Sequence, residues 1–286
     1  MKSLSLLFTI LLGTGIAHAQ NSNISVVRNE TAGLLGDISE KLLAAMKPEE
    51  RAMLDGVTIS VPIDANPLRI GTDGKRIELS TAFAIVSRQT VEAVLIERHF
   101  GRFAFGLIYP SYQARTYGDR QEGGDPAYKV ANLNEVERAK LNEDSTIHAE
   151  RMGLFAGLLA HVLAHEYGHI VLEHPVDELN FEKRRANEYA ADLWAHNLMI
   201  KEGIPPITAL YGMLYMYFLN EQNVDAERLS SHPIEAKRIL KMADLSIESF
   251  DQFKWPPDMS VSDKQKFRDL LVKFRRQLEK DFNSAK

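Results

Sequence analysis

The chain has no cysteine among its 286 residues, so disulfide bonds contribute nothing to its fold. Without a cysteine after the N-terminal apolar segment, it is also not a lipoprotein of the usual acyl-cysteine kind. A basic run is missing as well: 34 Lys and Arg residues stand against 39 Asp and Glu residues, which gives a net charge of −5. A mildly acidic chain of this kind argues against nucleic acid as a partner.

Internal repeats and long uncharged apolar runs are also absent from the sequence. Beyond the N-terminal segment no stretch suits a transmembrane helix, because the run at 207–219 is too short and the one at 154–172 carries titratable residues. With 45% apolar residues, the chain supports one sizeable domain, which we predict over residues 20–286. Apolar residues spaced for helical packing predict a C-terminal helical extension at 263–282.

The N-terminus has the pattern of a secretory signal peptide. Lys2 precedes an apolar segment at 4–16 that is too short to span a bilayer, and Ala17-His18-Ala19 is a signal-peptidase site. We expect cleavage after Ala19, removal of residues 1–19 and a bacterial periplasmic location. The alternatives are an uncleaved anchor and a buried helix.

The most informative segment reads His165-Glu166-Tyr167-Gly168-His169, the HExxH pattern, within an apolar stretch that would be helical. Positions four apart on a helix differ by about 40° around its axis, so the two histidines would share a face and hold one metal ion. Glu166 would reach water beside that ion, as in zinc hydrolases. A five-residue motif of this kind also occurs by chance in unrelated proteins, so the neighbouring motifs decide whether it marks a metal site.

A second helical run carries two acids at the same spacing. Glu188 lies 19 residues after His169, and Asp192 follows one turn later on the same face. A catalytic zinc takes three protein ligands, and two histidines with a glutamate from another helix are a known set. Glu188 is therefore the predicted third ligand, and Asp192 is placed to accept a hydrogen bond from a ligating histidine. The alternative, two ordinary acids on a solvated helix face, fits poorly with the apolar residues around them.

A third motif begins at His232. Pro233 is favoured at the first position of a helix, so His232 is the expected N-cap and Glu235 occupies the capping-box position. The positive end of the helix dipole disfavours a charged imidazole, so His232 is expected to be rigid and neutral.

HExxH, ExxxD and HPxxxxR in this order resemble the HtpX-like family of zinc endopeptidases, which are gluzincins and include the CAAX prenyl protease. The resemblance covers roughly residues 76–240. It implies one Zn²⁺ ion per chain, bound by His165, His169 and Glu188. It also implies that Glu166 is the general base that activates water.

The resemblance assigns supporting roles to three further residues. Asp192 would orient a ligating histidine, while His232 and Arg238 would lie beside the metal and stabilise the oxyanion or organise the site. For His232, an oxyanion donor and a blocking fourth ligand both remain open. The implied fold is α+β, a mainly helical zincin-like metalloprotease domain with a small β-sheet beside the HExxH helix. An extended polypeptide substrate would add itself to the sheet edge near 77–80.

One connection differs from the usual pattern of the family. The strand expected at 76–83 lies more than 70 residues before the end of the HExxH helix, which leaves room for an insertion. We predict that the loop at about 109–133 is a mobile flap over the cleft, because its glycines and Pro126 break regular structure. An inert surface excursion is the alternative. Another strand is expected at 57–63, and helices are expected at 31–46, 89–97, 133–142, 152–173, 181–202, 207–220 and 233–244.

Other histidines carry weaker signals. A metzincin is excluded because Leu172 stands where that signature requires glycine. His174 would lie about 140° from His169 around a continuous helix, so we expect a surface or capping role for it. His161 shares the face of His165, and either a packed core residue or a donor to the site is expected there.

The predicted function is a zinc-dependent endopeptidase of the bacterial cell envelope that acts on polypeptides, with protein quality control as one role. Two alternatives remain open. The zinc site is latent in the first, and the protein is mainly a periplasmic chaperone or adaptor; cleavage by purified protein separates the two. The second is a zinc hydrolase with another substrate, such as a peptidoglycan peptide, although no carbohydrate-binding module favours it.

Overall fold

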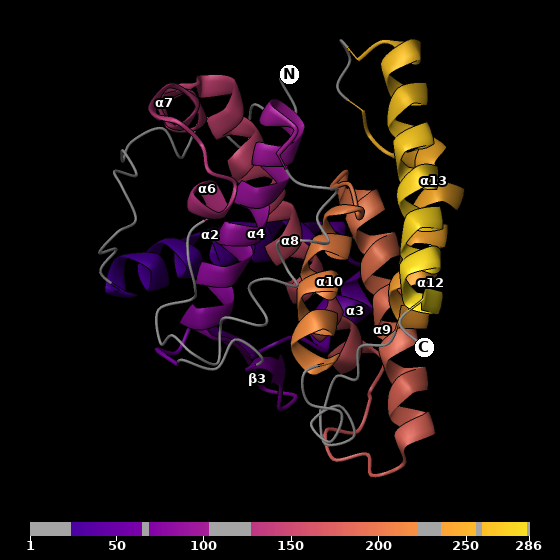
Figure 1. Ribbon diagram of the computed structural model, residues 1–286. Coiled ribbons are helices and arrows are strands. Elements are labelled where there is room, and N and C mark those ends of the chain that lie inside the picture. Colours follow the sequence, from indigo (N-terminus) through magenta and orange to yellow (C-terminus); the bar gives the residue numbers. More distant parts are fainter. Residues whose placement is uncertain (1–23, 65–68, 103–126, 222–235, 256–258, 285–286) are drawn as a thin grey trace.

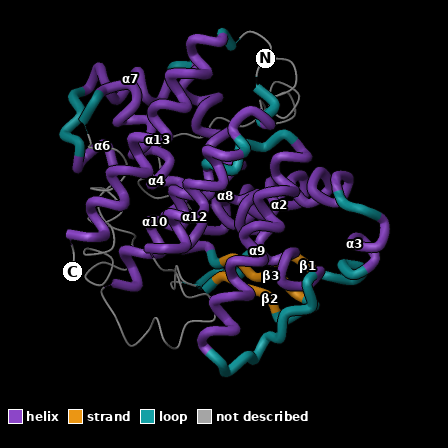
Figure 2. The backbone as a smooth tube through the Cα atoms, turned by 90° about the vertical axis from the view of Figure 1, so that its right-hand side faces the viewer, coloured by secondary structure: helices purple, strands orange, loops and turns teal. Residues whose placement is uncertain are grey.

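A computed structural model of the protein describes residues 24–64, 69–102, 127–221, 236–255 and 259–284. Helices dominate, and a small three-stranded sheet lies beside them (Figures 1 and 2), which confirms the predicted mainly helical α+β class. Within the described residues, no helix has the length and apolar character needed to cross a bilayer.

The helices differ widely in length, from a single turn to 27 residues. They are α2 (Ile24–Ala45), α3 (Pro48–Ala52), α4 (Thr81–Phe100), α6 (Ala127–Val130), α7 (Glu135–Glu143), α8 (Ser145–Val171), α9 (Phe181–Glu202), α10 (Thr208–Glu221), α12 (Ala236–Glu248) and α13 (Val261–Ser284). The strands are β1 (Thr58–Ser60), β2 (Ile70–Thr72) and β3 (Arg76–Leu79).

The sheet has the order β1-β3-β2, with β1 parallel and β2 antiparallel to β3. A tight turn joins β2 to β3: Gly74 has a φ of 84°, and the Asp73 carboxylate accepts the backbone N–H groups of Lys75 and Arg76. Because β3 is the central strand, its backbone is paired on both sides. The substrate edge expected at 77–80 is therefore wrong, and β2 is an edge strand instead.

Helix α4 begins directly after β3, earlier than the sequence predicted. The hydroxyl of Ser80 accepts the backbone N–H of Phe83 at 3.1 Å and caps the helix. The strand expected through residue 83 therefore ends at Leu79. At the other end, Gly101 adopts a φ of 63°, which terminates the helix.

Helices α8 and α9 pack closely and carry the two central motifs. Asp144 and Asn180 cap their N-termini through side-chain oxygens. Gly168, within the HExxH segment, makes the close approach possible, because a Cβ atom there would lie 3.2 Å from the Cα and O atoms of Ala191. The HExxH and ExxxD segments consequently face each other.

The buried apolar residues form two clusters. The larger one surrounds α8 and includes residues of α2, α4, α9 and the sheet. Tyr167 also connects α8 to α2 by a hydrogen bond, because its hydroxyl lies 2.7 Å from that of Ser39. The second cluster joins α10, α12 and α13, which lie together at the side of the molecule opposite α2 and α7 (Figure 1).

The end of the predicted flap packs into the larger core. Helix α6 contacts α4, and both Ala127 and Leu133 are buried. The flap interpretation is therefore wrong for residues 127–133, whose apolar side chains are needed by the core. The part at 109–126 lies outside the described residues.

Candidate metal centre

Three side chains from α8 and α9 converge on one point. The Nε2 atoms of His165 and His169 lie 3.0 Å apart. The carboxylate of Glu188 approaches both, at 3.2 Å from Nε2 of His165 and 3.3 Å from Nε2 of His169. One potential ligand atom from each residue lies within 4.8 Å of the others, so the group could bind a metal ion.

The charges around this point fit a divalent cation. Three carboxylates, those of Glu166, Glu188 and Asp192, are nearly fully buried, and Arg238 is the buried cation among them. With neutral histidines, three negative charges and one positive charge leave a net charge of −2, which is costly to bury. A dication balances it, and two imidazoles with one carboxylate are donors that zinc accepts.

The pKa of His165 reflects the same excess of negative charge. Burial alone would lower it, but the carboxylates of Glu188 and Asp192 outweigh burial and raise the pKa to about 10. A positive charge at this position is therefore strongly favoured, whether a proton or a metal ion supplies it.

Asp192 lies behind His165. Its Oδ1 atom is 2.9 Å from Nδ1 of His165, on the side of the ring that faces away from Glu188. Burial raises the pKa of Asp192, but Arg238 outweighs it and holds the pKa below its ordinary value. The carboxylate thus remains charged and can accept a hydrogen bond from the imidazole.

Arg238, from α12, connects the two acids of α9. Its Nε and Nη2 atoms donate to Asp192 at 2.5 and 2.8 Å, and Nη1 lies 2.6 Å from Glu188. Burial alone would lower its pKa, but the acids, with Asp192 foremost, raise it above the ordinary value. This geometry favours the organising role over the oxyanion role among the two that the resemblance implied for Arg238.

His161 forms a second possible metal-binding group with His165 and Asp192. This group is the poorer site, because Arg238 already engages both oxygens of Asp192. The Nε2 atom of His161 lies 3.8 Å from Asp192, and burial lowers the pKa of His161 to about 3. His161 is therefore a neutral, packed histidine beside the site.

His174 lies closer to the site than a continuous helix would place it. Helix α8 ends at Val171, and Glu173 has a φ of 53°, so the chain turns back. The backbone N–H of His174 donates to the carbonyl of His169 at 2.9 Å, a capping contact of the expected kind. The position of its side chain was not predicted, because the two Nδ1 atoms of His174 and His169 lie 3.0 Å apart.

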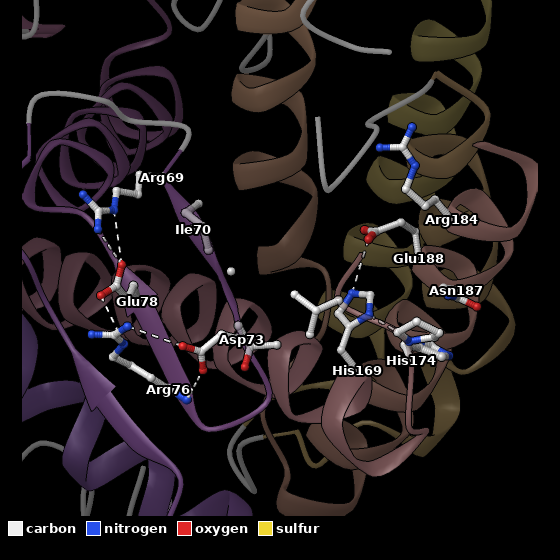
Figure 3. Close-up of a pocket in the computed structure, with 14 residues that line it drawn as sticks. Arg69, Ile70, Asp73, Arg76, Glu78, His169, His174, Arg184, Asn187 and Glu188 are labelled. Carbon is white, nitrogen blue, oxygen red and sulfur yellow. Dashed lines mark hydrogen bonds and ion pairs between the residues drawn. The ribbon is translucent and has the colours of Figure 1, made fainter. Parts of the chain in front are cut away.

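A pocket of about 410 Å³ opens beside the metal-binding group (Figure 3). Residues 69–73, which include β2, form one wall together with Arg76 and Glu78, and the loop at 174–176 forms another. His169 and Glu188 line it, so two of the three candidate ligands face the pocket. Its wall is held by ion pairs, because Arg69 binds Asp64 and Glu78 at 2.6 and 2.8 Å.

Two parts of this site were not predicted from the sequence. Strand β2 contains only three residues and includes a glycine, so alternation was too short to detect. For His174 a signal existed, because Pro175 marks a helix that ends shortly before it. His232 lies outside the described residues, and its roles remain predictions.

Comparison with known proteins gives one match. Residues 126–255 match the sequence model of a peptidase family, Peptidase U49. No curated protein and no solved structure matches the chain. The matched stretch runs from the start of α6 to Trp255 and so contains α8, α9 and Arg238. The candidate metal centre therefore lies within a region that is similar to a family of peptidases.

Proposed function

We propose that the protein is a zinc-dependent endopeptidase that uses the gluzincin mechanism, as the resemblance to the HtpX-like family implies. The observation that carries this proposal is the convergence of His165, His169 and Glu188 beside a pocket, in a region similar to a peptidase family. Their donor atoms and the buried charge of −2 both suit one divalent ion per chain.

The chemistry divides between the ion and the protein. A bound zinc ion supplies a Lewis acid that polarises a carbonyl group and acidifies water. Glu166 accepts a proton from the attacking water, whose oxygen bonds to the carbonyl carbon. It then delivers that proton to the amide nitrogen as the C–N bond breaks. Arg238 holds Glu188 and Asp192 in place throughout, so the reacting groups meet a fixed frame.

Strand β2 is the proposed support for an extended substrate. Ser80 donates to the carbonyl of Arg69, and Asp73 donates to that of Arg76, so residues 69, 71 and 73 face β3. In an antiparallel pair the intervening residues point outwards, so Ile70 and Thr72 present their backbone groups at the open edge. Because both residues line the pocket, a peptide paired with them would lie beside His169 and Glu188.

Substitution of the proposed base tests the mechanism. Glu166→Gln should retain zinc and fold but lose peptide hydrolysis by several orders of magnitude, because it removes the base and no ligand. Glu182→Gln, at an exposed acid of α9, is the matched control and should cleave normally. Purified mature protein would be assayed against a library of quenched peptides, with zinc measured by elemental analysis. Near-normal cleavage by Glu166→Gln, or no zinc in the wild type, would reject the proposal.

The proposed place of action is the bacterial envelope, on the basis of the signal-peptide pattern at residues 1–19. Cell fractionation followed by N-terminal sequencing should find a periplasmic protein that begins at Gln20. A cytoplasmic protein with an intact N-terminus would overturn this part alone. Substrates would then be sought by comparing envelope peptides between wild-type and Glu166→Gln strains.

A further inference from the structure

We infer that His174 is a positioning residue of the metal centre, which accepts a hydrogen bond from His169 and fixes the orientation in which His169 binds metal. This inference rests on the proposed function, because it takes His169 as a metal ligand. Nothing in the HExxH pattern assigns such a role to a residue five positions beyond it.

The two candidate ligand histidines are supported from behind in different ways. His165 directs Nε2 towards Glu188 and Nδ1 towards the carboxylate of Asp192, at 3.2 and 2.9 Å. His169 also directs Nε2 towards Glu188, at 3.3 Å, but its Nδ1 atom meets Nδ1 of His174 at 3.0 Å. A histidine ligand normally donates its second ring N–H to a fixed acceptor. His174 occupies the acceptor position for His169.

The direction of this hydrogen bond follows from metal binding. A ligating Nε2 atom must offer its lone pair, so the proton of neutral His169 is on Nδ1. Nδ1 of His174 must then accept, and His174 carries its own proton on Nε2. The pair thus selects one tautomer of each ring, and His174 does so without adding another negative charge to the site.

The backbone holds His174 in this position. Leu172 and Glu173 donate to the carbonyls of Gly168 and Ile170, and His174 donates to that of His169. Glu173 adopts a φ of 53° to allow this turn, and Pro175 prevents the helix from continuing. The acceptor is therefore positioned by the end of the same helix that carries the ligand. His174 also lines the pocket, which explains why it is only partly buried.

Two amide substitutions test the inference with matched chemistry. In His174→Asn, Oδ1 is attached to Cγ as Nδ1 is in histidine, so the acceptor is restored. In His174→Gln the acceptor lies one bond further out and misses His169. His174→Leu removes the acceptor while keeping apolar volume. We expect zinc binding to weaken about 10- to 100-fold in His174→Leu and His174→Gln, and to stay within about threefold of wild type in His174→Asn.

Zinc affinity would be measured by competition with a chromogenic chelator. The absorption spectrum of the cobalt-substituted protein would report ligand geometry, and it should change in the leucine and glutamine variants and return in the asparagine variant. Val176→Ala, an exposed neighbour on the same loop and pocket wall, is the control and should bind zinc normally. Melting temperatures in chelator would establish that the variants are folded.

The outcomes separate the two proposals. A wild-type protein that binds no zinc would reject the proposed function before any variant is compared. If the wild type binds zinc, equal affinities for the asparagine and glutamine variants would overturn the role of His174, even if the leucine variant failed to fold. Wild-type affinity in His174→Leu would overturn it as well.

Discussion

The candidate metal centre has an inner half and an outer half that are built on different principles. His165, Asp192 and Arg238 form the inner half, which is nearly fully buried and held by charged hydrogen bonds. His169 and His174 form the outer half, which borders the pocket and is held by a contact between two imidazoles. The two halves meet at Glu188.

This difference indicates that one half of the site mainly determines the stability of the fold and the other mainly determines ligand binding. Buried charges are tolerated only with partners, so changes in the inner half should act on the stability of the whole domain. The outer half is open to solvent on one side, so changes there should act on metal and substrate binding. Four changes, in order of decreasing expected effect, test this division.

Arg238→Met should have the largest effect on stability. It leaves the buried carboxylates of Asp192 and Glu188 without their cation, and we expect a loss of about 3 to 5 kcal/mol in the free energy of unfolding. Urea unfolding in the presence of a chelator measures this. Arg275→Met is the control, because Arg275 binds Asp244 in a partly exposed pair and its loss should cost about 1 kcal/mol or less. Equal losses would remove the distinction between buried and surface pairs.

Mild acid should lower the unfolding free energy through His161, which lies beside Asp192 of the inner half. Burial lowers the pKa of His161 to about 3, whereas the unfolded chain titrates near 6.5. Its contribution to stability is present above pH 6.5 and is lost as pH falls, because the unfolded state then takes up a proton that the native state refuses. His196, with a pKa lowered to about 4 by burial, acts in the same direction.

The His161→Met variant isolates this effect. Between pH 6.5 and 5, the wild type should lose about 1 to 2 kcal/mol more unfolding free energy than the variant, measured in chelator. His165 does not interfere, because its raised pKa gives a contribution that is fully present throughout this range. The same pH dependence in both proteins would show that His161 is charged in the native state.

Gly168→Ala tests the close contact between α8 and α9, the two helices that supply both halves. The added Cβ would lie 3.2 Å from backbone atoms of Ala191, so α8 and α9 must move apart by a few tenths of an ångström. We expect roughly 1 to 2 kcal/mol of destabilisation, together with weaker zinc binding. In Gly36→Ala nothing lies within 4 Å of the new atom, and better helix propensity should stabilise by about 0.5 to 1 kcal/mol. Normal zinc affinity in Gly168→Ala would show that the site tolerates helix separation.

Ile70→Pro should affect the pocket side alone. Proline removes an outward N–H at the start of β2 without disturbing a bond to β3, so the fold and zinc affinity should persist. The kcat/KM for extended peptides should fall up to about tenfold, which corresponds to one hydrogen bond. Ile70→Val keeps the N–H and should cleave almost normally. If both variants behave alike, the substrate does not pair with this residue.

Local signals explain what the sequence could predict. Helix α9 has the predicted bounds, because its N-cap, periodic apolar residues and terminal glycine are all encoded within the segment. The convergence of His165, His169 and Glu188 was also predicted, since spacing on two helices limits how they can meet. Their roles in binding zinc remain predictions, as do those of Glu166 and His232.

Contacts between distant residues explain what the sequence could not predict. The order of the sheet depends on which of the three short strands lies in the middle, and nothing within β3 encodes this. Arg238 reaches Asp192 across 46 residues, so its bidentate contact required the packing of α12 on α9. His174 was misjudged for a different reason, because a helix was extended past its true end.

The hydrogen bond between Ser39 and Tyr167 joins segments that are far apart in the sequence, and this matters while the chain is being synthesised. Helix α2 is synthesised early, yet its partners α8 and α9 follow more than 100 residues later. Helix α4 follows it sooner, but the apolar face with Leu35, Ile38 and Leu42 stays partly uncovered until α8 and α9 have been made. A partly uncovered apolar face is prone to aggregation during synthesis, so the nascent chain needs shielding until α8 has been made.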